Sequence, residues 1–258
     1  MSASISVPDL VARVRVAYAS ADGYRDEGEV TTVFVDETPA PRRRTQRKHF
    51  RTAFRRPDRF RFEYTVKGLG PSGEWDRRLV LWNEAGVHVH WTIRPAIRQE
   101  ETLAGALSSA TGVSGGASNL VAGLLLPESV THDPLFGAEA GAWVRTDVEG
   151  GRECDVLSYA SPGRPEPRTL WLDARTHLIL RIDDRHVFDD AWHLAQREAH
   201  EALLETDVSS EDRKMIEELV AHFASRPRGL RTETTTTCRP SLAVPDEGVF
   251  ATPTEWGA

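Results

Sequence analysis

Residues 79–91 read LVLWNEAGVHVHW and contain two short apolar runs separated by a turn signal. Leucine, β-branched and aromatic residues fill both runs, and this composition favours strands. The connecting residues Asn83-Glu84-Ala85-Gly86 are typical of a tight turn. We therefore expect residues 79–82 and 87–91 to form a β-hairpin.

Further strands are predicted on both sides of this hairpin. They are residues 30–35, 60–66, 143–148, 154–159, 170–172, 178–182 and 231–238. Apolar and polar side chains alternate along 60–66, so one face is apolar and the other is wet. Residues 231–238, RTETTTTC, have the low apolar content that suits an edge or solvated strand. Consecutive hairpins without alternating helices predict a mainly β (α+β) fold with an antiparallel sheet.

Helices are predicted before and between these strands. Pro8 and Asp9 begin the first, and Asp22-Gly23 ends it. Residues 101–126 predict two short helices around a Gly/Ser hinge. Residues 190–225 predict an inserted αα-hairpin. Its second helix has a serine-rich cap at 209–212 and an apolar face of Met215, Leu219, Val220 and Phe223.

Composition limits the classes of protein to consider. With 258 residues, 40% of them hydrophobic, the chain is long enough for one large β domain or two smaller ones. A net charge of −7 argues against a general nucleic-acid binder. The longest uncharged run, 102–127, contains five glycines and makes a poor membrane span. Two cysteines, Cys154 and Cys238, are too few for a disulfide framework, and a single bridge is expected only in an exported protein.

The N-terminus, MSASISVPDLVARVRV, lacks a basic region followed by an apolar one, which is the pattern of a secretory signal. The sequence as given therefore predicts a cytoplasmic protein. A periplasmic or cell-envelope location is the alternative if a leader is missing.

The segment Gly112-Val113-Ser114-Gly115-Gly116 matches the G-x-S-x-G pattern of a hydrolase nucleophile elbow. An elbow needs a buried strand before the serine and a helix after it, and the preceding residues make a poor strand. We therefore favour a hinge over an elbow. A serine hydrolase that uses Ser114 stays as an alternative.

Histidines suggest a metal site only weakly. His88 and His90 alternate along one strand and so point to the same face, a spacing that can bind a metal. Neither has an acidic or cysteine neighbour in the sequence. His186, His193 and His200 are seven residues apart and are more typical of a solvated face. We predict no metal site and no cofactor.

Basic residues are dense between 41 and 62, with only Asp58 opposing them. Between 51 and 61 they alternate with apolar residues, so we expect ion pairs with acidic residues such as Glu63 and Asp76. Residues 42–48 are predicted to form a loop that can contact an acidic protein or an anionic headgroup. The loop lacks stacking aromatics, which argues against nucleic acid. Its basic residues are Arg42, Arg43, Arg44, Arg47 and Lys48.

Several of these pieces, in this order, resemble the LolA/LolB-like superfamily of outer-membrane lipoprotein-sorting proteins. FRRPDRFRFEY at 54–64 is similar to the family's strand that begins with a basic residue and proline. Residues 79–91 and LWLDARTHLILRID at 170–183 resemble two of its hairpins, and VPDEGVFATP at 244–253 resembles its closing segment. The helices of 101–126 stand where the family has its lid. The insertion at 190–225 and the missing signal peptide depart from the family's pattern.

The resemblance implies one domain over 1–258, built as a half-open, curved antiparallel barrel with helices covering its concave face. It implies a non-catalytic carrier or sensor that binds a lipid, an acyl chain or another hydrophobic ligand. The residues expected to contact that ligand are Phe60, Phe62, Tyr64, Val89, Trp91, Leu120 and Leu124.

By the same resemblance, Arg56, just before Pro57, is expected to latch the lid by hydrogen bonds to its backbone carbonyls. A plain surface arginine is the alternative reading for this residue. Trp82, Trp91, Trp143 and Trp171 pack in the core or line a ligand wall, and the sequence does not separate the two. A ligand-free protein-interaction module of the same fold is a further alternative.

Overall fold

A computed structural model describes residues 5–36, 42–67, 75–92, 94–160, 166–204, 213, 216–217, 220–221 and 230–253. The density of contacts divides the chain into two compact units. The first contains residues 1–32, 46–184 and 234–258, and the second contains 33–45 and 185–233. That the whole chain forms a single domain stays a prediction.

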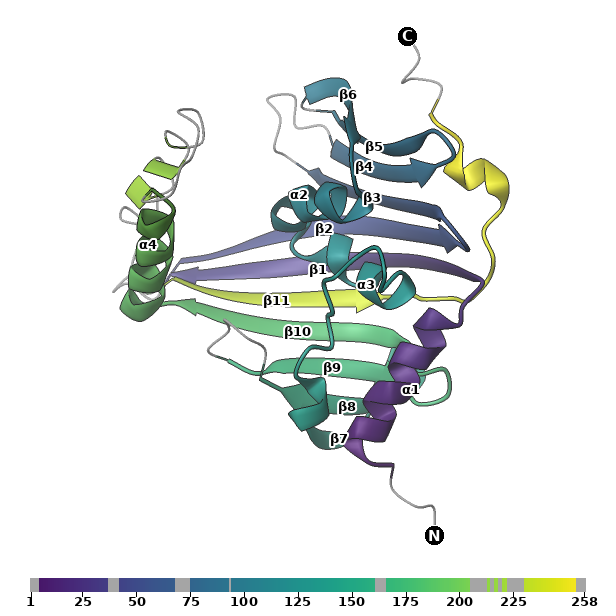
Figure 1. Cartoon of the computed structure of the whole chain (residues 1–258). Helices are drawn as coiled ribbons and strands as arrows, with labels where there is room; N and C mark the ends of the chain where they lie inside the picture. Colours follow the sequence, from purple (N-terminus) through teal and green to yellow (C-terminus); the bar gives the residue numbers. More distant parts are fainter. Residues whose placement is uncertain are drawn as a thin grey trace. The chain divides into compact units, whose positions relative to one another are not determined.

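Eleven strands of the described chain form one open, curved antiparallel sheet, with β6 and β7 at its two edges (Figure 1). The order across the sheet is β6-β5-β4-β3-β2-β1-β11-β10-β9-β8-β7. The mainly β antiparallel fold is confirmed, as an open sheet. The strands are β1 (Gly23–Asp36), β2 (Arg42–Arg55), β3 (Arg59–Lys67), β4 (Trp75–Asn83), β5 (Gly86–Trp91), β6 (Arg94–Glu100), β7 (Ala142–Glu149), β8 (Arg152–Tyr159), β9 (Arg168–Asp173), β10 (Ile179–Phe188) and β11 (Leu230–Cys238).

The three predicted hairpins are confirmed. In the first, β4 and β5 pair from Asn83 opposite Gly86, so the turn is only two residues long. Gly86 has φ +106°, a value that side-chain-bearing residues rarely adopt, and this is the reason for a glycine at the turn. The β7–β8 and β9–β10 hairpins form around the predicted turns in the same way.

Residues 231–238, predicted to form an edge or solvated strand, form a half-buried strand that is not at an edge. They belong to β11, which lies inside the sheet between β1 and β10. Threonine fits this position because its hydroxyl can bond across strands while its methyl group packs. The hydroxyl oxygens of Thr32 on β1 and Thr234 on β11 are 3.3 Å apart.

The prediction that residues 42–48 form a loop is also wrong, because they begin β2. The alternation of a strand then separates their side chains onto two faces. Arg47 and His49 are exposed, whereas Lys48 between them is buried. Lys48 is therefore not part of the exposed basic group that the sequence predicts.

Four helical segments of the first unit matter for the site. They are α1 (Val7–Ala19), α2 (Leu103–Ser114), the 3-10 turn η1 (Ala117–Asn119) and α3 (Ala122–Leu125). The hydroxyl oxygen of Ser6 caps α1 by accepting from the backbone N–H of Asp9, and Thr102 caps α2 in the same way at Gly105. The predicted N-terminal helix and the two helices around a hinge are confirmed.

The helices α1, α2 and α3 lie over one face of the sheet (Figure 1). We call this the inner face. Its apolar strand residues and the buried residues of all three helices belong to one hydrophobic cluster. A small second cluster of Ala53, Leu79, Leu81 and Phe250 lies on the opposite, outer face, where the 3-10 turn η3 (Glu247–Phe250) covers it.

The second unit contains α4 (Asp190–Leu204), which confirms the first half of the predicted αα-hairpin. Trp192 on this helix packs edge-on against Phe188, with ring centroids 4.6 Å apart. The cap at 209–212 and the apolar residues Met215, Leu219 and Phe223 of the predicted second helix lie outside the described residues. No helix in the described ranges is both long enough and apolar enough to cross a membrane.

Candidate functional site

The inner face near β3 is lined by apolar side chains. Phe60, Phe62 and Tyr64 alternate along β3 with the outer-face residues Arg61 and Glu63. The register continues this lining across the neighbouring strands, because Phe62 pairs with Val80 and Val80 pairs with Val89. Phe60 and Phe62 are 0% exposed, and Val89 is 2% exposed. This part of the sheet is therefore fully covered.

The cover is the segment 103–125, which contains α2, η1 and α3 and which we call the lid. Its buried side chains are small or aliphatic, and α2 contacts β4, β5 and β6. Leu120 and Leu124 belong to the same hydrophobic cluster as Phe60, Phe62, Tyr64 and Val89. Six of the seven predicted ligand contacts thus come together here, although their role as contacts stays a prediction.

The seventh, Trp91, is half-buried at the end of β5 and lies outside that cluster. Its ring faces the guanidinium of Arg78, whose central carbon is 5.4 Å from the ring centroid. Trp91 therefore marks the edge of the covered face, where apolar and charged side chains meet.

Two glycines join the halves of the lid. Gly115 and Gly116 have φ +69° and +91°, and Gly115 ends α2 in the left-handed conformation. A short polar network also connects the two halves. The hydroxyl of Ser118 donates to the carbonyl of Leu107 at 3.0 Å, and the amide of Asn119 donates to the hydroxyl of Thr111 at 2.7 Å. The lid therefore consists of two helical halves that are joined by a glycine hinge and by hydrogen bonds.

Arg56 lies at the end of this lid. Its Nη2 is 3.4 Å from the carbonyl oxygen of Leu125, the last residue of α3, and 2.5 Å from that of Ala19 in α1. Its Nε donates to the carbonyl of Ala21 at 3.0 Å. The last carbonyls of a helix lack helical partners, so they are natural acceptors for such a cation. The side chain joins the lid and the end of α1, and its role as a latch stays a prediction.

The hypothesis of a nucleophile elbow at Ser114 is wrong. Ser114 is the last residue of α2, so a helix rather than a strand precedes it. Its side chain is buried, donates to the carbonyl of Thr111 at 3.2 Å and accepts from the N–H of Ser118 at 3.2 Å. Both bonds hold the hinge together, which is the alternative that the sequence favours.

Sequence reasoning missed two buried cations at the inner face, Lys48 on β2 and Arg78 on β4. They are 7% and 3% exposed. Burial lowers the pKa of both groups, because desolvation penalises the charged form. Strand alternation with Phe50 and Val80 was the signal in the sequence, but in β2 it depends on recognising 42–48 as strand.

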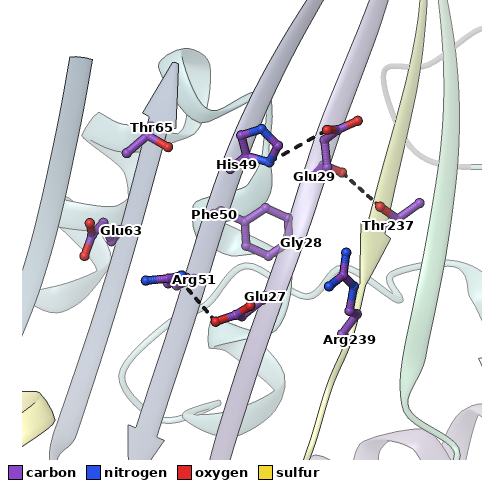
Figure 2. A pocket seen from close by; sticks show the side chains of 10 residues that line it. All are labelled: Glu27, Gly28, Glu29, His49, Phe50, Arg51, Glu63, Thr65, Thr237 and Arg239. Atoms are coloured by element: carbon purple, nitrogen blue, oxygen red, sulfur yellow. Dashed lines mark hydrogen bonds and ion pairs between the residues drawn. The ribbon is translucent and has the colours of Figure 1, made fainter. Parts of the chain in front are cut away.

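The outer face carries paired charges around a pocket of about 410 Å³ (Figure 2). Figure 2 shows Arg51 beside Glu27 and His49 beside Glu29, with N···O distances of 3.2 and 3.7 Å. Nearby, Arg61 pairs with Glu63 at 3.1 Å. The predicted ion pairing is confirmed for Arg51, Arg55, Arg59 and Arg61, whereas Arg56 bonds to backbone carbonyls instead. The side chain of Asp76 lies outside the described part.

The histidines of the described chain lie in separate places. His88 lies 3.1 Å from the carbonyl oxygen of Ala85, and His186 and His193 pack around Trp192 in the second unit. Within the described ranges, no three or more His, Cys, Asp or Glu side chains are placed to hold a metal ion.

A buried polar cluster lies where β1 meets β11. The hydroxyl of Tyr24 donates to Asp26 at 3.0 Å, and the backbone N–H of Arg239 donates to the same carboxylate at 2.9 Å. Burial raises the pKa of Asp26 to about 6, even though these hydrogen bonds lower it. Cys238 is buried beside it as a free thiol whose pKa is also raised by burial.

No model of a known protein family matches the chain, and no curated protein matches it at the level searched. Solved structures do match it over nearly its whole length. A chain of the Pseudomonas aeruginosa MucA/MucB complex matches with TM-score 0.40 and 12% identity, covering 96% of this chain and 62% of that one. This chain therefore spans about three fifths of the length of that relative.

Two further solved structures match over their own full length as well. A LolA superfamily protein from Nitrosomonas europaea has TM-score 0.30 and 7% identity, with 96% of this chain and 99% of that chain covered. A putative outer membrane lipoprotein-sorting protein domain from Vibrio parahaemolyticus has TM-score 0.34 and 9% identity, with 94% and 95% covered. The chain thus has structural matches among LolA-superfamily, MucB-containing and lipoprotein-sorting structures, at low sequence identity.

Proposed function

We propose that this chain is a non-catalytic binding protein for a lipid or another hydrophobic ligand. The inner face is the binding surface, and the lid is its movable cover. The observation that carries the proposal is the lid itself: a segment of small residues with a glycine hinge covers an aromatic face and contacts Arg56 at its end.

Ligand binding on this surface requires the lid to move. Four pockets lined by described residues lie on the outer face, beside η3 or along α1. The aromatic side chains of β3 are fully covered in this state. The protein as described is therefore the closed form, and the ligand takes the place of the lid.

An acyl chain can cover the inner face about as favourably as the lid does. Each methylene that leaves water contributes about 0.8 kcal/mol, so an acyl chain with a dozen carbons replaces the apolar contacts of several leucines. The interior glycine of α2, Gly112, costs the helix about 1 kcal/mol relative to alanine. The hydrogen bond from Arg56 to the carbonyl of Leu125 opposes opening, and the bonds to Ala19 and Ala21 hold the arginine in place.

The direct test is to extract any lipid that copurifies with the protein and to identify it by mass spectrometry. A second measurement follows the release of a fluorescent acyl probe. We expect Arg56→Leu to release the probe faster than the parent protein. Arg51→Leu is the matched control, because Arg51 lies on β2, shortly before Arg56, but pairs with Glu27 on the outer face. Failure of the folded parent protein to bind any acyl probe would refute the proposal, and equal release rates would remove only the latch.

The two alternative functions are a serine hydrolase and a ligand-free protein-interaction module. A hydrolase using Ser114 lacks the strand that an elbow needs, and the serine hydroxyl is committed to the hinge. A ligand-free protein-interaction module stays a prediction. Lipid extraction separates it from a lipid-binding protein, because a module without ligand yields none.

A further inference from the structure

Two cations lie at the inner face under the edge of the lid. Lys48 on β2 pairs in register with Val66, and Arg78 on β4 pairs with Tyr64, so both are on the face that carries Phe50, Phe62 and Val80. They are 7% and 3% exposed, in a region whose neighbours are otherwise apolar. Lysine and arginine are almost never buried to this degree without a partner of opposite charge.

The ammonium group of Lys48 lies beside the glycine hinge of the lid, Gly115-Gly116. Its ammonium lies 3.5 Å from the position that a Cβ on Gly115 would take, next to the C-terminal end of α2. The carbonyl end of a helix attracts a cation. However, desolvation is the one cause of the lowered pKa of Lys48, with no carboxylate or hydrogen-bond acceptor among the described residues acting on it. The helix end therefore compensates only part of its burial.

Arg78 ends beside the same helix, at its outer edge. Its Nη2 donates to the hydroxyl of the exposed Ser109 at 2.5 Å, and its guanidinium stacks over Trp91. Its Nε is buried and makes no hydrogen bond within the described chain. The nearest charges on β6 oppose each other, since Arg98 disfavours the cation and Glu100 favours it. Among the described residues, this guanidinium with its five donors thus has one hydrogen-bond acceptor, the hydroxyl of Ser109.

Buried cations without a carboxylate destabilise a protein, so their presence calls for an anion that joins them at some stage. Resting on the proposed function, we propose that the ligand of the inner face is an anionic amphiphile. Its carboxylate or phosphate head binds Lys48 and Arg78 at the edge of α2, and its acyl chain lies along Phe60, Phe62 and Val89.

The positions fit such a ligand. Ser109 and Gly115, the lid residues beside the two cations, are six residues apart on α2, which is about 9 Å along the helix. Only β3 separates the strands of Lys48 and Arg78, so the two long side chains can meet over that strand once the lid moves. The head group of the ligand then lies beside the exposed Ser109, where water reaches it, and the acyl chain lies on the apolar inner face.

The experiment compares ligands that share a chain and differ in the head. Hexadecanoic acid and hexadecanol form one pair, and a monoacylglycerol phosphate and the matching monoacylglycerol form the other, each displacing a neutral fluorescent acyl probe. We expect the parent protein to prefer the charged member of at least one pair by about tenfold, the factor that one charge-assisted hydrogen bond supplies. The pair with the larger preference identifies the carboxylate or the phosphate.

Lys48→Met and Arg78→Met are each expected to remove most of that preference while the affinity for the neutral ligands stays the same or rises. Arg47→Met is the matched control, because Arg47 precedes Lys48 on β2 but its side chain is exposed, and it should keep the preference. Equal affinities of the parent protein for charged and neutral ligands would overturn this inference and leave the proposed function intact. Failure to bind any of the four ligands would end both.

Stability of the ligand-free protein gives a second, independent readout. Removing a cation that lacks a partner relieves a cost, whereas removing one member of a buried ion pair strands the other. We therefore expect Lys48→Met to raise the melting temperature of the ligand-free protein. A lower melting temperature would show that a carboxylate of the chain, such as that of Asp76, already holds Lys48, and would overturn the inference.

Discussion

Asp26 shows at the scale of one residue how the sheet tolerates a buried carboxylate. The side chain accepts hydrogen bonds from Tyr24 and from the backbone of Arg239, and Asp26 is 2% exposed. Desolvation outweighs these hydrogen bonds and raises the pKa of Asp26 to about 6. The folded protein therefore binds this proton more tightly than the unfolded chain does.

This difference predicts a pH dependence of stability. The contribution of Asp26 is fully present below about pH 4, its unfolded pKa, and is lost as the pH rises through about 6. Two pKa units correspond to about 3 kcal/mol. We expect the free energy of unfolding of the parent protein, measured against Asp26→Asn, to fall by up to this amount between pH 4 and pH 7 in urea titrations. A difference that stays constant with pH would contradict the raised pKa.

At the scale of one element, two glycines of the lid have different structural roles. Gly112 lies inside α2, and a Cβ there would meet nothing within 4 Å. Gly123 lies at the start of α3, and a Cβ there would come within 1.8 Å of the carbonyl oxygen of His132. The first glycine weakens its helix without a packing reason, and the second allows the lid to pack closely on residues 130–132.

The two glycines therefore predict opposite effects of the same substitution. Gly112→Ala should stabilise the closed lid by about 0.5–1 kcal/mol and slow the uptake of an acyl probe. Gly123→Ala should destabilise the protein by about 1–3 kcal/mol or more, because the backbone of His132 must shift. Thermal unfolding and stopped-flow probe binding measure both effects. Faster uptake by Gly112→Ala would argue against an opening lid.

At the same scale, local signals explain which elements were predictable. Turn residues such as Gly86 and Gly115, and caps such as Thr102, act within a few residues, and the hairpins and lid helices they define were predicted correctly. β2 was missed at its start because five of its first seven residues are basic. Their exposed side chains make such a strand read as a loop, while the buried Lys48 reveals its alternation.

At the scale of the whole molecule, the order of strands depends on contacts far apart in the sequence. β11 lies between β1 and β10, although about 200 residues separate Thr32 from Thr234. Threonine content alone does not distinguish such an interior strand from an edge strand, because packing against neighbours sets strand preference. The apolar site was predictable from alternation on β3. Alternation also places Lys48 and Arg78 on the inner face, but their burial was not predictable, since their cover comes from the distant lid.

The central claim at this scale is that an apolar ligand displaces the lid from the inner face. Hydrogen exchange at the amides of residues 103–125, with and without saturating hexadecanol, tests it most directly. We expect these amides to lose protection in proportion to ligand occupancy, while the amides of β3 and β4 keep theirs. Binding of the ligand with the protection of the lid unchanged would contradict the claim.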